Sequence, residues 1–279
     1  GGYYVHPASW NLGVRELNST SNVGVEGRWA YRVDNYLHTE PSCNDVVLAG
    51  DFTSALSSST YGRIMQYSCR DDAWQPLPDG FNGAVHAVAY YRGYLYAGGE
   101  FTADASETTE LRYFARWDGA AWSAVPGGLE GPVYALTEYK NKLLVGGDFV
   151  LAYGSVEAAR LATWDGRRWR AVVEPPPTGA VRTIVPFLNG ELLIGGEFEG
   201  IGETTGIAFA ATLTTEADTD FYVHPPPALT DGPVRTAAYV AMNAYTNFIC
   251  LGGAFASATG SFTVDAAGLA CVLDGYESN

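Results

Sequence analysis

A short motif that recurs five times constrains the fold of this chain more than any other feature. Each copy has a few apolar residues, a small pair (Gly-Gly, or Ala-Gly in the first copy), one further residue that is acidic in four copies, and a phenylalanine. The second glycines are Gly50, Gly99, Gly147, Gly196 and Gly253, separated by 49, 48, 49 and 57 residues. Repetition at this period is typical of a propeller or a solenoid.

Each repeat also predicts short strands separated by turn residues. The clearest repeat predicts strands at 85–90, 94–101, 113–117 and 122–125, with an Asp-Gly hairpin turn at Asp118. The next predicts 133–139, 143–149, 161–164 and 169–173. In the other repeats we expect strands at 46–52, 64–67, 74–77, 181–187, 192–198, 209–213, 221–223, 234–240, 248–255 and 268–273. Plentiful glycine and aromatic residues also favour an all-β fold, so the prediction is a β-propeller of four-stranded antiparallel blades.

The two ends of the chain indicate how the propeller closes. The last repeat lacks a fourth strand, and Tyr3-Tyr4-Val5-His6-Pro7 nearly duplicates Phe221 to Pro225, the fourth strand of the preceding repeat. We therefore expect the N-terminal strand to complete the last blade, which removes unpaired strand edges. This predicts one domain over 1–279, with a closing strand and loop in 1–28 and five blades of about 48 residues in 29–279. Counting Gly1-Gly2 as a sixth repeat glycine gives a six-bladed alternative.

The charge of the chain bears on its partners. A net charge of −15 argues against nucleic acid and anionic membranes, which attract basic patches. No run of 18 apolar residues is present, so the sequence predicts no transmembrane helix. Because the chain opens on Gly1-Gly2 without methionine, we interpret it as a mature or excised segment.

The four cysteines favour disulfides over metal binding, since they form no CxxC pair. Cys43 lies where the second strand of the first blade opens and Cys69 follows the third strand of that blade, so the two points are adjacent in an antiparallel pair. Cys250 and Cys271 lie on the second and third strands of the last blade. Each pair therefore predicts a disulfide, with buried thiols as the alternative. The sequon at Asn18 predicts a glycan, and together these features favour an extracellular or cell-surface protein.

The repeats resemble the kelch-like repeats of galactose-oxidase-type propellers. The motifs that carry the resemblance are Gly98 to Phe101, Ala115 to Gly119 with Trp122, and Gly131 to Leu136. They are most similar to the fungal cortical polarity-marker propellers and related cell-surface repeat proteins. The resemblance covers about 45–275 and implies an extracellular interaction module rather than a named reaction.

Two sets of repeated residues are candidates for a site. His86, Tyr134, Arg182 and Arg235 share one position at the start of the innermost strand, where they face the channel mouth or pack between blades. Basic groups there could bind an anionic ligand such as a carboxylate. A second set, Asp51, Glu100, Asp148 and Glu197, follows the glycine pair, and it reads either as a Ca²⁺-binding belt or as caps of turn amides. We predict no cofactor, no metal site and no catalytic residue, because we find no nucleophile elbow or phosphate loop.

Two functions fit these observations. The first is a non-catalytic extracellular glycoprotein that serves as a structural, adhesion or filament-building module. Its expected partners are other extracellular proteins or copies of itself, with glycans a further possibility. The alternative is a carbohydrate-active propeller enzyme with its site at the channel mouth.

Overall fold

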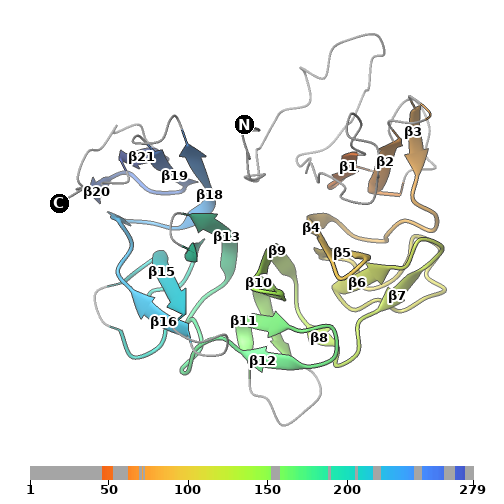
Figure 1. The fold of residues 1–279 in the computed structure, drawn as a ribbon, viewed down its shortest axis with the longest axis horizontal. Coiled ribbons are helices and arrows are strands. Elements are labelled where there is room, and N and C mark those ends of the chain that lie inside the picture. Colours follow the sequence, from red (N-terminus) through yellow and green to blue (C-terminus); the bar gives the residue numbers. More distant parts are fainter. Residues whose placement is uncertain are drawn as a thin grey trace. The chain divides into compact units, whose positions relative to one another are not determined.

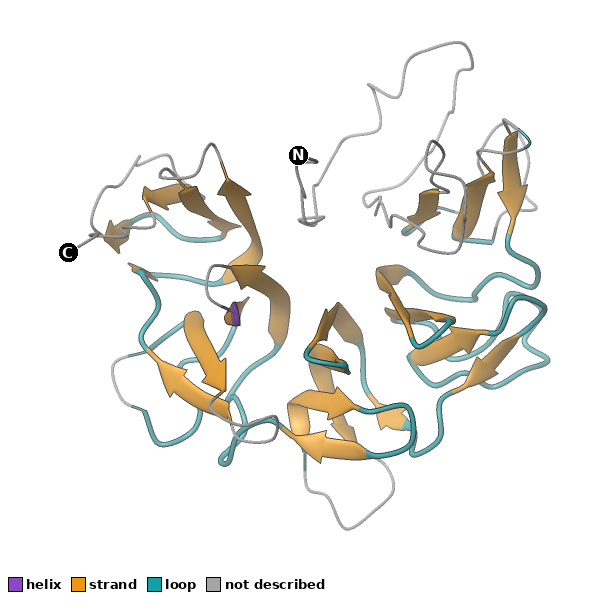
Figure 2. Cartoon of the chain, viewed as in Figure 1, coloured by secondary structure: helices purple, strands orange, loops and turns teal. Residues whose placement is uncertain are grey.

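The chain is described from a computed structural model, over residues 46–52, 62–68, 71, 73–151, 158–187, 190–204, 207–215, 221–241, 247–260 and 268–273. Strands joined by turns and loops make up this part, apart from one very short helical piece drawn in purple (Figure 2). The strands form antiparallel sheets (Figure 1). Their fold class is the five-blade β-propeller. The predicted all-β propeller is therefore confirmed. A helix long and apolar enough to cross a membrane does not occur among the described residues.

The chain divides into two units by the density of its internal contacts. The N-terminal unit contains the described residues from 46 to 138 together with Leu151, and the C-terminal unit contains 139–150 and the described residues after 155. The boundary falls inside β9 (Val133–Tyr139).

The N-terminal unit has two sheets of consecutive antiparallel strands. The first is β1 (Val46–Ala49), β2 (Ile64–Ser68) and β3 (Ala73–Pro76). The second is β4 (Val85–Tyr91), β5 (Tyr94–Gly99), β6 (Phe114–Trp117) and β7 (Trp122–Ala124), and β8 (Leu129–Glu130) follows it. Apolar side chains from both sheets, with Phe81 and Phe101, make one buried cluster.

The C-terminal unit repeats this pattern. Its elements are β10 (Lys142–Leu151), β11 (Ala159–Trp164) and β12 (Trp169–Ala171), then β13 (Val181–Phe187), β14 (Glu191–Gly196), β15 (Ala210–Thr215) and β16 (Phe221–His224), and finally β17 (Ala228–Thr230), β18 (Val234–Ala241), β19 (Asn247–Gly253), β20 (Ala258–Gly260) and β21 (Leu269–Leu273). Strands β13 to β16 pair in chain order, β18 pairs with β19 and β19 with β21, and β17 pairs with β20. A second buried cluster includes Leu193, Val234, Leu251 and Val272.

The first glycine makes room for the next blade in three of the four Gly-Gly pairs, whereas at Gly252 an added methyl group would lie 2.8 Å from a methyl carbon of Thr236 in its own blade. A methyl group added at Gly98 would lie 2.3 Å from a methyl carbon of Val133, which opens the following blade. The same clash arises at Gly146 with Val181, at 2.8 Å, and at Gly195 with Val234, at 2.6 Å. The repeated glycine therefore exists because consecutive sheets pack with a valine seated directly on the backbone.

The second glycine brings two segments of its own blade together. A methyl group at Gly99 would lie 2.0 Å from the carbonyl oxygen of Ala84, just before β4. This carbonyl accepts a hydrogen bond from the Glu100 N–H at 2.8 Å. The strand pairing shifts register between Val85 and Ala87, so β5 ends at the second glycine and not at Phe101, where the sequence placed its end.

Each third strand begins beside a residue in the left-handed region. These residues are Arg63, Tyr113, Arg160, Phe209 and Gly268, with φ of 68°, 67°, 64°, 64° and 80°. In the second blade the carbonyl of Tyr113 accepts a hydrogen bond from the Gly99 N–H at 3.0 Å. Four of the five are not glycine, so this turn has no glycine signal by which it could be predicted from the sequence.

Candidate functional site

The four residues predicted to line the channel mouth do share one structural position. His86, Tyr134, Arg182 and Arg235 are the second residues of β4, β9, β13 and β18. In the N-terminal unit, the rings of His86 and Tyr134 lie 5.2 Å apart between centroids. This contact fits the predicted packing between neighbouring blades. Arg182 and Arg235 belong to the other unit, so a single site built from all four stays a prediction.

Two of these residues contact an acid inside their own blade, His86 through a hydrogen bond and Arg182 through an ion pair. His86 Nε2 lies 3.1 Å from Glu100 Oε1, and an Arg182 terminal nitrogen lies 2.9 Å from Glu197 Oε1. Each acid stands directly after the glycine pair. The predicted channel-mouth residues and the repeated acids are therefore in contact in the second blade (β4–β7) and in the fourth (β13–β16). The pairing ties the start of the first strand to the end of the second.

In the first and third blades the acid pairs with a different strand. Asp51 lies 3.8 Å from Arg63 Nε, and Asp148 lies 3.3 Å from Arg160 Nε. Both arginines are the left-handed residues of the third strand. The shorter aspartates reach the third strand and the longer glutamates reach the first. The four acids are therefore partners of basic groups, and the expected capping of turn amides falls to other residues.

The capping role belongs to a residue three positions before the first strand. Asn82 accepts hydrogen bonds from the amides of Thr102 and Ala103 at 2.9 and 3.1 Å. In the last blade Asp231 accepts from the amides of Ala256 and Ser257 at 2.8 and 3.0 Å. The Ser257 amide and hydroxyl and the Ala256 amide lower the pKa of Asp231. No sequence pattern predicted this cap, since its side chain differs from blade to blade.

The last blade departs from the ion-pair pattern. Ala254 stands where the other blades have an acid, and Arg235 is exposed, with no hydrogen bond or ion pair to a described residue. Of the four predicted residues, Arg235 is the one whose charge is available to a ligand. In the described part of the chain, no group of three or more His, Cys, Asp or Glu residues is placed to hold a metal ion.

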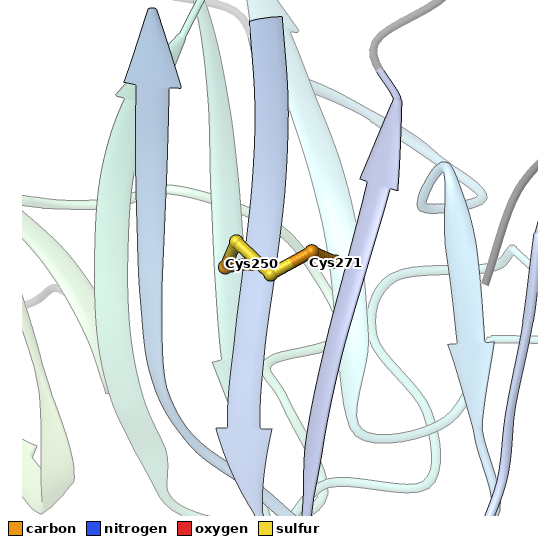
Figure 3. Close-up of a disulfide and its surroundings, with 2 residues drawn as sticks. All are labelled: Cys250 and Cys271. Carbon is orange, nitrogen blue, oxygen red and sulfur yellow. A yellow bond between two sulfur atoms is a disulfide. The ribbon is translucent and has the colours of Figure 1, made fainter. Parts of the chain in front are cut away.

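One of the predicted disulfides is present in the last blade. Cys250 on β19 and Cys271 on β21 are directly opposite in the strand pairing, with an S–S distance of 2.06 Å (Figure 3). The prediction for this pair is confirmed. Cys43, Cys69, the sequon at Asn18 and the strand expected at 3–7 lie outside the described residues, and the predictions for them stand untested.

Solved structures of other proteins show only distant similarity. The N-terminal domain of Nup159 aligns with a TM-score of 0.39 and 9% identity, covering 81% of this chain and 59% of that one. A GH74 enzyme of Niastella koreensis gives 0.35 and 14%, covering 74% and 39%, and YCF48 bound to a D1 peptide gives 0.32 and 11%, covering 84% and 75%. The chain thus spans less than two thirds of the Nup159 domain. No curated protein matches it.

A family model, by contrast, matches most of the sequence. It describes the Rax2 C-terminal beta propeller domain and matches residues 8–179. The matched range is more than half of the chain and includes the repeats with the clearest motifs. The blades, the glycine pairs and this match agree, and the chain belongs to the family of the Rax2 C-terminal beta propeller domain.

Proposed function

We propose that the chain is a non-catalytic extracellular propeller that binds other proteins at the cell surface. The observation that carries the proposal is the use of the repeated charged residues. In four blades the acid after the glycine pair is engaged with a basic group of the same blade, which joins strands. Charges used in this way support a scaffold, and propeller scaffolds serve binding as readily as catalysis.

The carboxyl groups with shifted pKa values support the same proposal. Those of Asp104, Asp118, Asp165 and Asp231 all have lowered pKa values. Asp104, Asp118 and Asp165 accept hydrogen bonds from amides of their own turn or loop, and Asp231 accepts them from the loop that follows β19; these bonds stabilise the charged form. A general acid in glycoside hydrolysis requires the opposite shift, so these groups act as turn caps.

The extracellular part of the proposal rests on the disulfide and the sequon. Cys250 and Cys271 form a cross-strand bond, and structural disulfides persist mainly in oxidising compartments. The sequon at Asn18 is compatible with passage through the secretory pathway. Adhesion and filament building would both use the same propeller as a platform.

Binding to intact cells tests the proposal directly. The chain, secreted from a eukaryotic host and fluorescently labelled, should bind saturably to cells of its source organism, and protease treatment of the cells should abolish binding. The denatured, reduced chain is the control. Incubation with a panel of cell-wall polysaccharides should release no new reducing ends. Release of reducing ends without saturable binding would favour the carbohydrate-active alternative and overturn the proposal.

A further inference from the structure

Three exposed arginines gather on one hairpin of this acidic chain, and the charges of two of them, Arg168 and Arg170, favour the ionised form of Asp165 in the same turn. Arg167, Arg168 and Arg170 lie in and beside the turn between β11 and β12, and all three are exposed. Among the described residues their side chains make no hydrogen bond and no ion pair within 4 Å. Four other arginines pair with carboxylates: Arg63, Arg112, Arg160 and Arg182.

The hairpin does not need these arginines in order to fold. The equivalent turn between β6 and β7 has Ala120, Ala121 and Ser123 at the same three positions. There Asp118 accepts hydrogen bonds from the two following alanine amides at 2.8 and 2.9 Å. Asp165 does the same with the Arg167 and Arg168 amides, both at 2.8 Å.

The tryptophan pairs of the two hairpins also pack at similar distances. Trp117 and Trp122 have ring centroids 5.5 Å apart, and Trp164 and Trp169 have theirs 5.0 Å apart. Two turns of one geometry thus differ in three side chains, which are neutral in one blade and cationic in the other. Charged residues on an outer strand can prevent aggregation through its unpaired edge. The equivalent outer strand β7 has no charged residue, so this role does not explain the arginines at β12.

The chemistry of the cluster favours a short run of carboxylates as its ligand. Arg168 and Arg170 flank the buried Trp169 at alternate positions, so their Cα atoms lie about 7 Å apart along the strand. Guanidinium groups bind carboxylates through paired hydrogen bonds. The net charge of −15 disfavours a long polyanion, because it would extend past the hairpin over an acidic surface.

We propose that the hairpin of Asp165 to Arg170 is a docking surface for a short acidic segment of another protein. This proposal rests on the proposed function as an interaction module, and it identifies one surface that would contact the partner protein. The arginines would supply attraction and orientation at the rim of an interface, where charges mainly affect the rate of association and the dependence on salt. Their removal therefore should weaken binding without changing the fold.

The experiment exchanges the side chains of the two hairpins. A fluorescein-labelled ten-residue peptide with four glutamates is titrated with the whole chain, and anisotropy is measured at low and at physiological salt. The R167A/R168A/R170S variant, which copies the β6–β7 hairpin, should bind about tenfold more weakly, since each exposed ion pair contributes about a factor of two. The reverse graft, A120R/A121R/S123R, should add a second peptide site. A glutamine version of the peptide should not bind.

Other outcomes overturn the proposal. Equal peptide binding by the R167A/R168A/R170S variant would show that the hairpin is not the site, and tighter binding of heparin than of the peptide would assign the hairpin to sulfated glycans. Salt-sensitive dimers of the chain alone that the triple substitution abolishes would assign the hairpin to self-association. If cell binding is unchanged in the triple variant, this docking surface is wrong while the interaction-module function stands. If cell binding is absent from the unaltered chain, that function fails.

Discussion

At Gly99 the backbone comes so close to the residue before β4 that no side chain fits. The added methyl carbon would lie 2.0 Å from the Ala84 carbonyl oxygen, and Gly196 and Gly253 show the same distance to their own equivalents. The repeated glycines are visible in the sequence, and the structure supplies their reason, which is a close approach of two backbone segments. The left-handed residues were not visible, because Arg63, Tyr113, Arg160 and Phe209 have no feature that marks positive φ.

The first prediction at this scale is that Gly99→Ala destabilises the protein strongly. Because the obstructing atoms are backbone, relief requires a shift of β4 or β5, and we expect a loss of about 3 kcal/mol in the free energy of unfolding. Gly200→Ala is the matched control, since its added carbon would meet only Thr178 Cγ2 at 3.6 Å. Urea denaturation measures both. Similar stabilities for the two variants would contradict this explanation of the repeated glycine.

The second prediction concerns Asp104, a buried acid in the loop between β5 and β6. Burial alone would raise its pKa, but the Thr108 amide and the hydroxyls of Thr109, Thr108 and Ser106 lower the pKa to about 2. A lowered pKa contributes stability that is complete above about pH 4 and is lost as the pH falls towards 2. Asp104→Asn should therefore cost about 2 kcal/mol at pH 6 and little at pH 2.

Denaturant titrations of the Asp104→Asn variant between pH 2 and pH 6 check this dependence. The control is Glu138→Gln, on an exposed position of β9, which should leave the pH profile unchanged. An Asp104→Asn variant whose deficit is the same at every pH would show that the loop depends on the shape of the side chain and not on its charge.

At the scale of the element, the first strands were predicted best. Strand β13 coincides with the predicted 181–187, because a short run rich in apolar and β-branched residues stands just before an Asn-Gly pair in the sequence. Strands β8, β17 and β20 were missed, since two or three residues are too few to show a period. The ion pairs were also missed, because Glu100 and Glu197 meet partners 14 and 15 residues away and only the strand register brings them together.

The prediction at this scale concerns the disulfide of the last blade. Cys250 and Cys271 are 21 residues apart, and the bond restricts the unfolded chain between them. Replacing both by alanine should cost about 3 kcal/mol. Hydrogen exchange should increase most in β19 and β21 and least in β5 and β6 of the second blade. Uniform acceleration along the chain would indicate that the blades unfold together and not separately.

At the scale of the whole molecule, the repeat alone predicted the fold class and the number of blades. The period, the glycine pair and the Asp-Gly turns describe one unit, and five copies of it predict five blade sheets, which the described residues form together with a separate two-stranded sheet of β17 and β20. Function was less accessible, because the repeated residues maintain the blades. The candidate binding residues are those that differ from the repeat. In the blade of Arg235 an alanine stands at the position of the repeated acid, and the β11–β12 hairpin has three arginines where the β6–β7 hairpin has neutral residues. Such departures are informative only after the repeated role of each position is known.

The last prediction concerns the edge of β21 and the strand expected at residues 3–7. In the fourth blade β15 and β16 pair with Leu213 opposite Val223 and Thr212 opposite His224. Gly195 and Gly252 are equivalent, and they pair with Ala210 and Leu269 respectively. Carrying this register to the last blade, with Val5 in place of Val223, sets Val5 opposite Val272.

A cysteine pair tests both the register and the identity of the closing strand. Val5→Cys with Val272→Cys should oxidise to a cross-linked monomer, because directly opposite residues in antiparallel strands are within reach of a disulfide. Val5→Cys with Ala270→Cys, two residues out of register, should stay largely reduced. Mass spectrometry and non-reducing electrophoresis distinguish the products. Covalent dimers from the first pair would mean that the strand completes the blade of a second copy, a heterologous contact that propagates into rings or filaments. Equal oxidation of both pairs would show that the strand has no fixed register and does not close the blade.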